Sequence, residues 1–167
     1  MSHLFRLVVV GASLLLAGCG PKEPEPPVIT EQEKAAQRRV ELFGAAATAA
    51  DITWRPSGLG IRILAPGEGV SPQVTDVIRV HYTGRLKDGH VFDDSHVRGK
   101  PSDFVLNRMI TGLAAGIPVL KPGGRAEFFI PPSLGYGGMR SGDIPPVSGL
   151  IFEVELIAVN PEPAAKP

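Results

Sequence analysis

Short alternations of apolar and polar residues fill most of the chain beyond residue 50. In the clearest of them, Ile78, Val80 and Tyr82 occupy one phase, with Arg79 and His81 between them. A period of two places the apolar side chains on one face of a β-strand. Further short runs of this kind cover residues 59–64, 126–130 and 150–158, and one short helix fits within 110–120. This succession predicts an antiparallel sheet with a helix on one face, an α+β fold.

A helical period precedes the strands. Thr30 and Glu33 have the spacing of a capping box, and small or apolar residues then recur every three or four positions: Ala36, Val40, Phe43, Ala47 and Ala50. The pattern predicts an amphipathic helix over residues 30–50. Its alanine-rich stripe either packs on the main domain or forms a dimer seam. One helix of this length makes a poor dimer arm, so we expect a monomer.

The first eighteen residues have the features of an export signal. Residues 7–16 form an almost unbroken apolar run behind Arg6, too short to span a bilayer as a mature helix. The next residues, Leu16-Ala17-Gly18-Cys19, resemble a bacterial lipobox, in which the signal is cut before an acylated cysteine. We therefore expect residues 1–18 to be a lipoprotein signal peptide and Cys19 to carry lipid such as palmitate. An ordinary secretory signal with an incidental cysteine is the alternative.

Both ends of the mature chain have the composition of segments without a core. Residues 19–29 are rich in proline and predict an extended, semi-rigid tether that lifts a domain off a membrane. Residues 160–167 are predicted to be a disordered tail. Gly20 stands after the cysteine instead of Asp, which by resemblance to enterobacterial lipoproteins implies the outer membrane, facing the periplasm.

Charge and cysteine content exclude several classes of function. The chain has 17 basic and 17 acidic residues, whereas a nucleic-acid-binding protein normally shows a basic surplus. Its single cysteine allows no intramolecular disulfide. The four histidines lack the spacing of metal ligands, so we expect no metal site.

The most informative segment lies within residues 80–95. Val80-His81-Tyr82-Thr83-Gly84 places a tyrosine on a strand, and a turn at Asp88-Gly89 then leads to Val91-Phe92-Asp93. An aromatic wall with one carboxylate suits the binding of an apolar peptide segment. It also suits rotation about an X–Pro bond, a reaction that needs no nucleophile. Further segments follow in order: Phe104 with Leu106, Ile110 with Gly112, Ile130-Pro131-Pro132, Leu134-Gly135-Tyr136-Gly137, Ile144-Pro145-Pro146, and Leu150-Ile151-Phe152-Glu153-Val154.

Together, in this order and spacing, these segments resemble an FKBP-type peptidyl-prolyl cis–trans isomerase domain over residues 57–159. The resemblance implies a bent antiparallel sheet of about five strands wrapped on a short α-helix, with a proline-binding cleft between them. It implies a rotamase that works without a cofactor. Its partners would be proline-containing unfolded or folding proteins of the envelope, together with the macrolide inhibitors that bind this family.

The resemblance also implies a site. Tyr82, Asp93 and Tyr136 would be catalytic, with the Tyr136 hydroxyl donating a hydrogen bond to a substrate carbonyl. Substrate would be bound by Phe92, Phe104, Met109, Ile110, Leu113, Ile144 and Phe152. The backbone N–H of Ile110 would hold a second carbonyl. Without the resemblance, the aromatic residues could equally be plain core, and Asp93 could belong to a turn.

The chain departs from the family pattern at the floor of the cleft. Leu113 stands where a tryptophan is usual, and Met109 replaces the usual valine before Ile110. Leu113 would leave the pocket deeper and without an indole N–H, which implies weakened macrolide binding. Pro118 is expected to end the short helix early. Two alternatives to an active isomerase therefore stay open: a holdase or peptide-binding module with weak or no catalysis, and an envelope lipoprotein that keeps only the fold.

Overall fold

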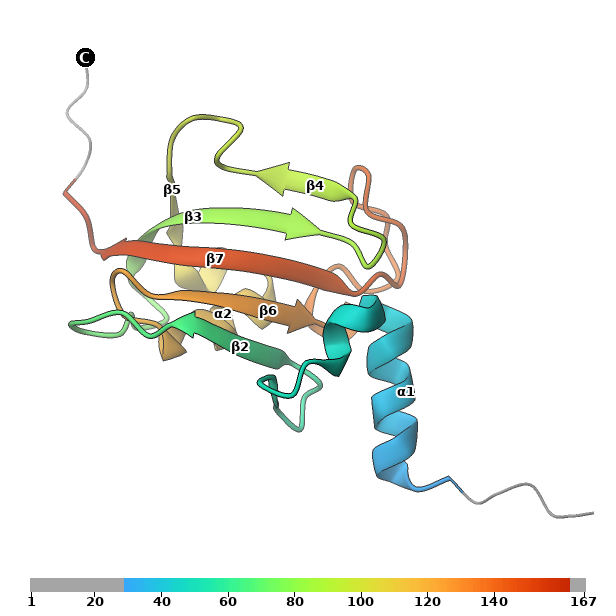
Figure 1. Ribbon diagram of the computed structural model, residues 1–167. Coiled ribbons are helices and arrows are strands. Elements are labelled where there is room, and N and C mark those ends of the chain that lie inside the picture. The colour runs from blue at the N-terminus through green and yellow to red at the C-terminus, as the bar shows by residue number, and fades with distance from the viewer. Residues whose placement is uncertain (1–28, 163–167) are drawn as a thin grey trace, which may run out of the picture.

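A computed structural model describes residues 29–162 and places one bent antiparallel sheet at the centre of the molecule (Figure 1). The sheet has seven strands: β1 (Thr53–Trp54), β2 (Gly60–Ala65), β3 (Val77–Arg85), β4 (Val91–Asp94), β5 (Ser102–Val105), β6 (Arg125–Ile130) and β7 (Leu150–Val159). They lie in the order β1-β2-β6-β7-β3-β4, and β5 pairs with β3 outside this path. The expected signal peptide, Cys19 and all of the expected tether except Ile29 lie outside the described residues.

The long strand β3 explains why there are more strands than the expected five or so. One edge of β3 pairs with β7 along nearly its whole length. The other edge is shared, because Val77 to Val80 pair with β5 and Thr83 to Arg85 pair with β4. The other strand that was not expected is β1. It has only two residues, too few to show an alternation of apolar and polar positions in the sequence.

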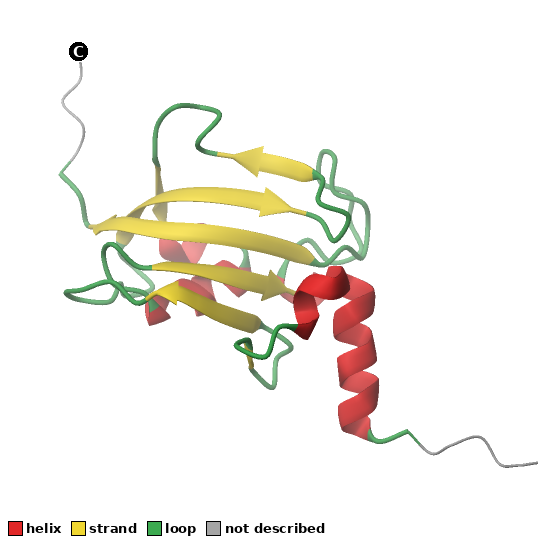
Figure 2. Ribbon diagram, viewed as in Figure 1, coloured by secondary structure: helices red, strands yellow, loops and turns green. Residues whose placement is uncertain are grey.

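Short helices cover one face of the sheet (Figure 2). The α-helix α2 (Thr111–Gly116) is followed by a 3-10 turn over Ile117–Val119, both within the helical segment expected at residues 110–120. The α-helix ends two residues before Pro118, as expected for a residue that cannot donate a backbone hydrogen bond. The main core lies between α2 and the sheet, where β3 contributes Ile78, Val80 and Tyr82.

The N-terminal helix differs from the sequence prediction in length and in packing. α1 (Glu31–Phe43) begins with the expected capping box, in which Thr30 and Glu33 exchange hydrogen bonds. It ends at Phe43 because Gly44 adopts a φ of 66°, and a 3-10 turn then covers Gly44–Thr48. The prediction of one continuous helix over residues 30–50 was therefore wrong.

The predicted stripe of this helix is not one packed face. Of its five members, only Phe43 and Ala47 are buried, whereas Val40 is 45% exposed and Ala36 and Ala50 are also exposed. Figure 1 shows the reason, because α1 leans away from the sheet and touches it only at its C-terminal end. Periodicity could identify the helix but not where along its length the domain would meet it.

A second, smaller core lies where α1 meets the sheet. Phe43, Ala47 and Ile52 pack there on Phe129 of β6 and Ile151 of β7. The Phe43 ring meets the Phe129 ring edge-on, with centroids 5.7 Å apart. Because side chains alternate across a strand, Phe129 faces this cluster while its neighbour Phe128 faces the main core. The N-terminal segment therefore closes the face of the sheet opposite α2.

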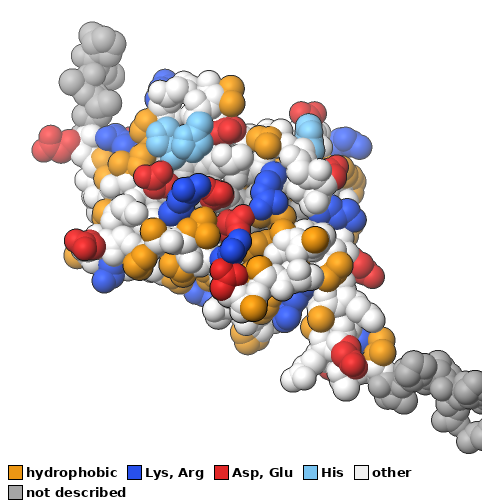
Figure 3. Space-filling model, in the orientation of Figure 1, with side chains coloured by type: hydrophobic (Ala, Val, Ile, Leu, Met, Phe, Trp, Pro, Cys, Tyr) orange, Lys and Arg blue, Asp and Glu red, His pale blue; other side chains and the backbone are white. Residues whose placement is uncertain are grey.

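Beyond this cluster the outer face of the sheet carries ion pairs, visible as neighbouring blue and red side chains in Figure 3. Glu127 of β6 pairs with Arg62 at 3.2 Å and with Arg85 at 2.8 Å, and Arg125 pairs with Glu153. These ion pairs provide partners for the charged side chains on a part of the sheet that no helix covers. Among residues 29–162, no helix combines the length and the apolar character needed to cross a bilayer.

The first residue of the expected C-terminal tail, Asn160, is held against the sheet by hydrogen bonds. The backbone N–H of Asn160 donates to the Val77 carbonyl at 2.7 Å, and its side-chain oxygen accepts from the Val77 N–H at 3.0 Å. Its side-chain amide donates to Asp76 at 3.0 Å. Asn160 thus ties the end of β7 to the start of β3, and placing it in a disordered tail was wrong. Residues 163–167 of that tail lie outside the described part.

Candidate functional site

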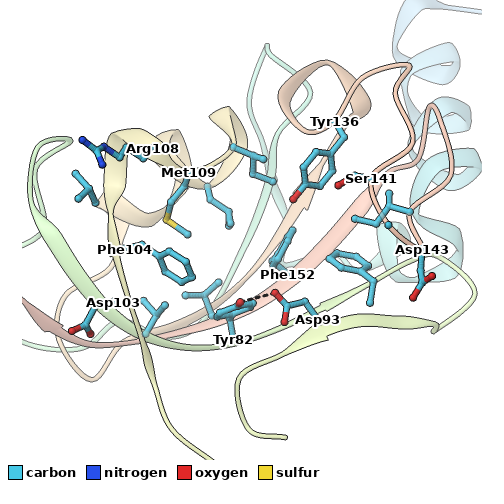
Figure 4. A pocket seen from close by; sticks show the side chains of 18 residues that line it. Tyr82, Asp93, Asp103, Phe104, Arg108, Met109, Tyr136, Ser141, Asp143 and Phe152 are labelled. Atoms are coloured by element: carbon cyan, nitrogen blue, oxygen red, sulfur yellow. Dashed lines mark hydrogen bonds between the residues drawn. The ribbon is translucent and has the colours of Figure 1, made fainter. Parts of the chain in front are cut away.

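A cavity of about 680 Å³ opens between α2, the strands β3, β4, β5 and β7, and the loop that follows β6 (Figure 4). This volume is within the usual range for pockets that bind small ligands, roughly 300–1,000 Å³. Ten of its lining residues are those proposed from the sequence: Tyr82, Phe92, Asp93, Phe104, Met109, Ile110, Leu113, Tyr136, Ile144 and Phe152. The fold therefore brings the whole set together, although their roles toward a substrate stay predictions.

Aromatic rings form the walls of the cavity. The Phe92 and Phe152 rings meet edge-on with centroids 5.4 Å apart, and the Tyr82 and Phe104 rings do so at 5.8 Å. The Tyr82 and Phe152 rings are 6.3 Å apart. Such edge-to-face contacts stabilise rings against one another. The walls are therefore held in place by their own contacts before any ligand binds.

Gly84 makes room for these walls. It lies on β3 opposite Phe152 of β7, and a Cβ atom at this position would lie 2.5 Å from the Phe92 ring and 2.9 Å from the Phe152 ring. Gly84 belongs to the Val80–Gly84 motif, but the motif alone predicts no role for it. The available signal was a glycine within an alternating strand, which often marks a close approach of neighbouring groups.

A polar cluster borders the aromatic walls. The Tyr82 hydroxyl donates to the Asp93 carboxylate at 2.6 Å, and the Arg98 guanidinium donates to the Tyr82 hydroxyl oxygen at 2.8 Å. Arg98 also forms an ion pair with Asp93 and lies over the Tyr82 ring, 5.4 Å from its centroid. The hydroxyl proton of Tyr82 is therefore used in the hydrogen bond to Asp93 and is not available to a substrate. Arg98, for which the sequence predicted no role, completes this cluster from the turn between β4 and β5.

The cluster shifts the pKa values of its members. Burial by itself raises the pKa of Asp93, but the hydrogen bonds from Tyr82 and Arg98 outweigh it, so the pKa lies below its ordinary value. Burial, followed by the hydrogen bond to Asp93, raises the pKa of Tyr82. At neutral pH the cavity therefore has an ionised carboxylate and a neutral phenol side by side. This carboxylate is neutralised by Arg98 and is poorly suited to act as a base.

Two hydrogen-bond donors in the cavity remain available. The Tyr136 hydroxyl points into the cavity (Figure 4) and makes no hydrogen bond to any residue within 29–162. The backbone N–H of Ile110, just before the first turn of α2, also has no acceptor in this part of the chain. Two donors beside an apolar wall can hold the carbonyl oxygens of an extended peptide.

The remaining predicted residues close the cavity above and below. Leu113 lies on α2 and is only 4% exposed, so a leucine side chain occupies the floor. Ile144 is also 4% exposed, and it is held in a tight turn by two backbone hydrogen bonds with Ser141, of 2.9 and 3.1 Å. Met109 follows a 3-10 turn (Leu106–Arg108) and lies on the wall beside Phe104. Within residues 29–162, no group of three or more potential ligands could hold a metal ion.

Comparison with known proteins agrees with this geometry. Residues 68–157, more than half of the chain, match the family described as FKBP-type peptidyl-prolyl cis-trans isomerase, and the chain belongs to this family. It is 45% identical over 113 residues to a probable FKBP-type peptidyl-prolyl cis-trans isomerase of Haemophilus influenzae, covering 67% of this chain and 47% of that protein. It is 46% identical over 104 residues to the FKBP-type 22 kDa peptidyl-prolyl cis-trans isomerase of Escherichia coli, covering 62% and 50%.

A solved structure gives the same result for the fold. The crystal structure of FkpA from Escherichia coli is similar to this chain with a TM-score of 0.69 and 36% sequence identity, over 79% of this chain and 60% of that one. The expected FKBP-like fold is therefore confirmed. The chain spans about half the length of the curated relatives it matches, so the similarity concerns the domain and not those proteins as wholes.

Proposed function

We propose that the chain is a peptidyl-prolyl cis–trans isomerase whose substrates are proline-containing polypeptides bound in the aromatic cavity. The observation that carries this proposal is the pair of available donors, the Tyr136 hydroxyl and the Ile110 N–H, beside an apolar wall. Asp93, the carboxylate beside the aromatic walls, is neutralised by Arg98 and therefore offers no free base next to them.

The chemistry of amide rotation fits such a cavity. Rotation meets a barrier of ~18–20 kcal/mol because the C–N resonance is lost when the peptide plane twists. The planar amide is more polar than the twisted one, so an apolar cavity disfavours the twisted form less than water does. Binding the twisted form more tightly than the planar form lowers the barrier. A millionfold gain in rate corresponds to about 8 kcal/mol of such differential stabilisation.

The residues divide this work between them. Tyr82, Phe152 and their neighbours exclude water from the proline ring and the twisting bond. The Tyr136 hydroxyl and the Ile110 N–H fix carbonyl oxygens on the two sides of that bond, so that rotation proceeds about one defined axis. Asp93 and Arg98 fix the orientation of the Tyr82 ring through hydrogen bonds to its hydroxyl group. They do not take part in proton transfer.

A proline-isomerisation assay tests this proposal. The purified protein is expected to accelerate cis-to-trans relaxation of a short Xaa-Pro peptide, with apolar residues before proline favoured by the apolar walls. Tyr136→Phe removes one donor and is expected to lower kcat/KM by roughly tenfold, the worth of one hydrogen bond at the upper end of its usual range. Its thermal stability is expected to stay unchanged, because the hydroxyl has no partner among residues 29–162.

The opposite outcomes separate the alternatives. Relaxation at the rate of buffer alone would contradict catalysis. Suppressed aggregation of an unfolded client that does not depend on proline would then favour the holdase. A Tyr136→Phe protein that is less stable but equally active would place the hydroxyl in the fold rather than in the reaction.

We also propose that this activity serves protein folding in the bacterial envelope, with the protein anchored in a membrane through a lipid on Cys19. Support comes from the apolar run of residues 7–16, the following Leu-Ala-Gly-Cys sequence and the proline-rich residues 19–29. Incorporation of labelled palmitate that is lost in Cys19→Ala, together with recovery of the protein in outer-membrane fractions, is the expected result. Label retained by the variant would contradict the anchor, and recovery in the inner membrane would contradict the sorting.

A further inference from the structure

The cavity carries two charges that its own ion pairs do not neutralise. Four of its lining residues are charged: Asp93, Asp103, Arg108 and Asp143. Asp93 is paired with Arg98, and Asp103 accepts two hydrogen bonds of 2.7 Å from the guanidinium of Arg79. Arg108 and Asp143 form no ion pair with any residue within 29–162.

These two charges are at opposite ends of the cavity. Figure 4 shows Arg108 at one end, beyond Met109 and Phe104, and Asp143 at the other end, beyond Ser141 and Asp93. The aromatic walls lie between them. A peptide that lies along these walls therefore meets a positive charge toward one of its ends and a negative charge toward the other.

The backbone holds both charges at the rim. Arg108 is the last residue of the 3-10 turn before α2, where the Met109 N–H donates to the Leu106 carbonyl at 3.2 Å. Asp143 lies inside the tight turn that pairs Ser141 with Ile144. Arg140 precedes this turn, but it does not line the cavity and makes no ion pair with Asp143. Both charged side chains are exposed, so a bound peptide can reach them without removing an existing partner.

We propose that Arg108 and Asp143 select substrates by charge, favouring proline peptides with an acidic residue on the side that faces Arg108 and a basic residue on the side that faces Asp143. This inference rests on the proposed function of the cavity and adds the class of sequence that it prefers. Exposed ion pairs are weak, and each is expected to change kcat/KM by about twofold to fivefold at low salt.

Matched peptides test the proposal. Three peptides of one length are compared at low salt. The first has glutamate before and lysine after the proline, the second has these two residues exchanged, and the third has glutamine at both positions. One charge order is expected to exceed the other in kcat/KM by on the order of fivefold. The difference is expected to vanish near 1 M salt, where the Debye length falls to about 3 Å.

Charge exchange in the protein makes the test specific to these residues. The double variant Arg108→Glu with Asp143→Lys is expected to invert the preferred charge order. Arg140→Gln, which changes a nearby charge outside the cavity, is expected to leave the order unchanged. Equal kcat/KM for the two charged peptides in the wild-type protein, or a preference that survives the double exchange, would overturn the proposal.

A binding measurement separates this inference from the proposed function. Affinities of the same three peptides are measured by fluorescence anisotropy, which does not require turnover. If the neutral peptide binds but is not isomerised, catalysis is contradicted, while the charge order of binding still decides the inference. If the neutral peptide is isomerised and the two charged peptides behave alike, the inference fails and the proposed function holds.

Discussion

Arg98 determines the electrostatics of the polar side of the cavity, because its guanidinium holds both the Tyr82 hydroxyl oxygen and the Asp93 carboxylate. The sequence identified Tyr82 and Asp93 as site residues but not the cation that neutralises them. No periodicity signals an arginine in an irregular turn, five residues after its carboxylate partner. At the residue scale, the resemblance to the family predicted which residues line the cavity. The hydrogen bonds and the ion pair between these residues could be identified only from the structure.

Removing this guanidinium is predicted to raise the pKa of Asp93. In Arg98→Leu, burial still raises that pKa, while only the hydrogen bonds from the Tyr82 hydroxyl and the Asp94 backbone are left to lower it. A carboxyl group with a lowered folded-state pKa stabilises the fold above its unfolded pKa, and this stability is lost as pH falls through the folded pKa. The loss is therefore expected at higher pH in the variant. A carbon-13 NMR titration of the Asp93 carboxyl measures the shift, with Arg140→Leu as control. An unchanged titration would show that Arg98 does not hold the carboxylate ionised.

The leucine floor gives a second prediction at the residue scale. Leu113→Trp places an aromatic ring and an indole N–H on α2 beneath the cavity, which is expected to raise isomerase activity or the affinity for macrolide inhibitors of the family. Titration with such an inhibitor measures the affinity, and Leu113→Phe is a control that adds a ring without the N–H. If the tryptophan variant gains nothing in either measurement, Leu113 does not limit the site.

Individual elements were predictable where local pattern decides them and unpredictable where packing does. The alternation in β3 and β7 fixed both strands and their buried faces, because one side of each strand meets the main core. α1 was recognised from its cap and period, but the period could not show that the domain contacts only the C-terminal part of the helix, from Arg39 onward. Ile63 is 45% exposed although its regular pairing with Ala126 keeps it in phase with the buried Ile61, so the alternation located the strand but not the end of its buried face.

The contact between α1 and the sheet gives a prediction at the element scale. Phe43 is 1% exposed and packs on Trp54 and Phe129, so Phe43→Ala is expected to cost about 3–5 kcal/mol of unfolding free energy. Val40→Ala, on the same helix but 45% exposed, is the matched control and is expected to cost less than about 0.5 kcal/mol. Urea unfolding measures both. Equal small losses would mean that α1 does not contribute to the folded domain.

At the scale of the whole molecule, the cavity and the contact with α1 lie on opposite faces of the sheet. The α2 face encloses the cavity, and the opposite face receives the end of α1, none of whose residues lines the cavity. α1 itself therefore leaves the cleft uncovered. A monomer remains the expected state, and light scattering of the purified protein checks it.

Isomerisation in the aromatic cavity, as proposed, can be tested most directly at Gly84, where a larger residue would narrow the cavity. Gly84→Ala would place a Cβ atom 2.5 Å from the Phe92 ring, which forces that ring to move toward the cavity or the strands to part. The measurement is the cis–trans exchange rate of an Xaa-Pro peptide by NMR, with thermal unfolding to confirm that the variant is folded. We predict fast exchange with the wild-type protein and a rate near that of the free peptide with folded Gly84→Ala. Exchange that is equally fast with both proteins, or that is no faster with the wild-type protein than in buffer, would contradict the account.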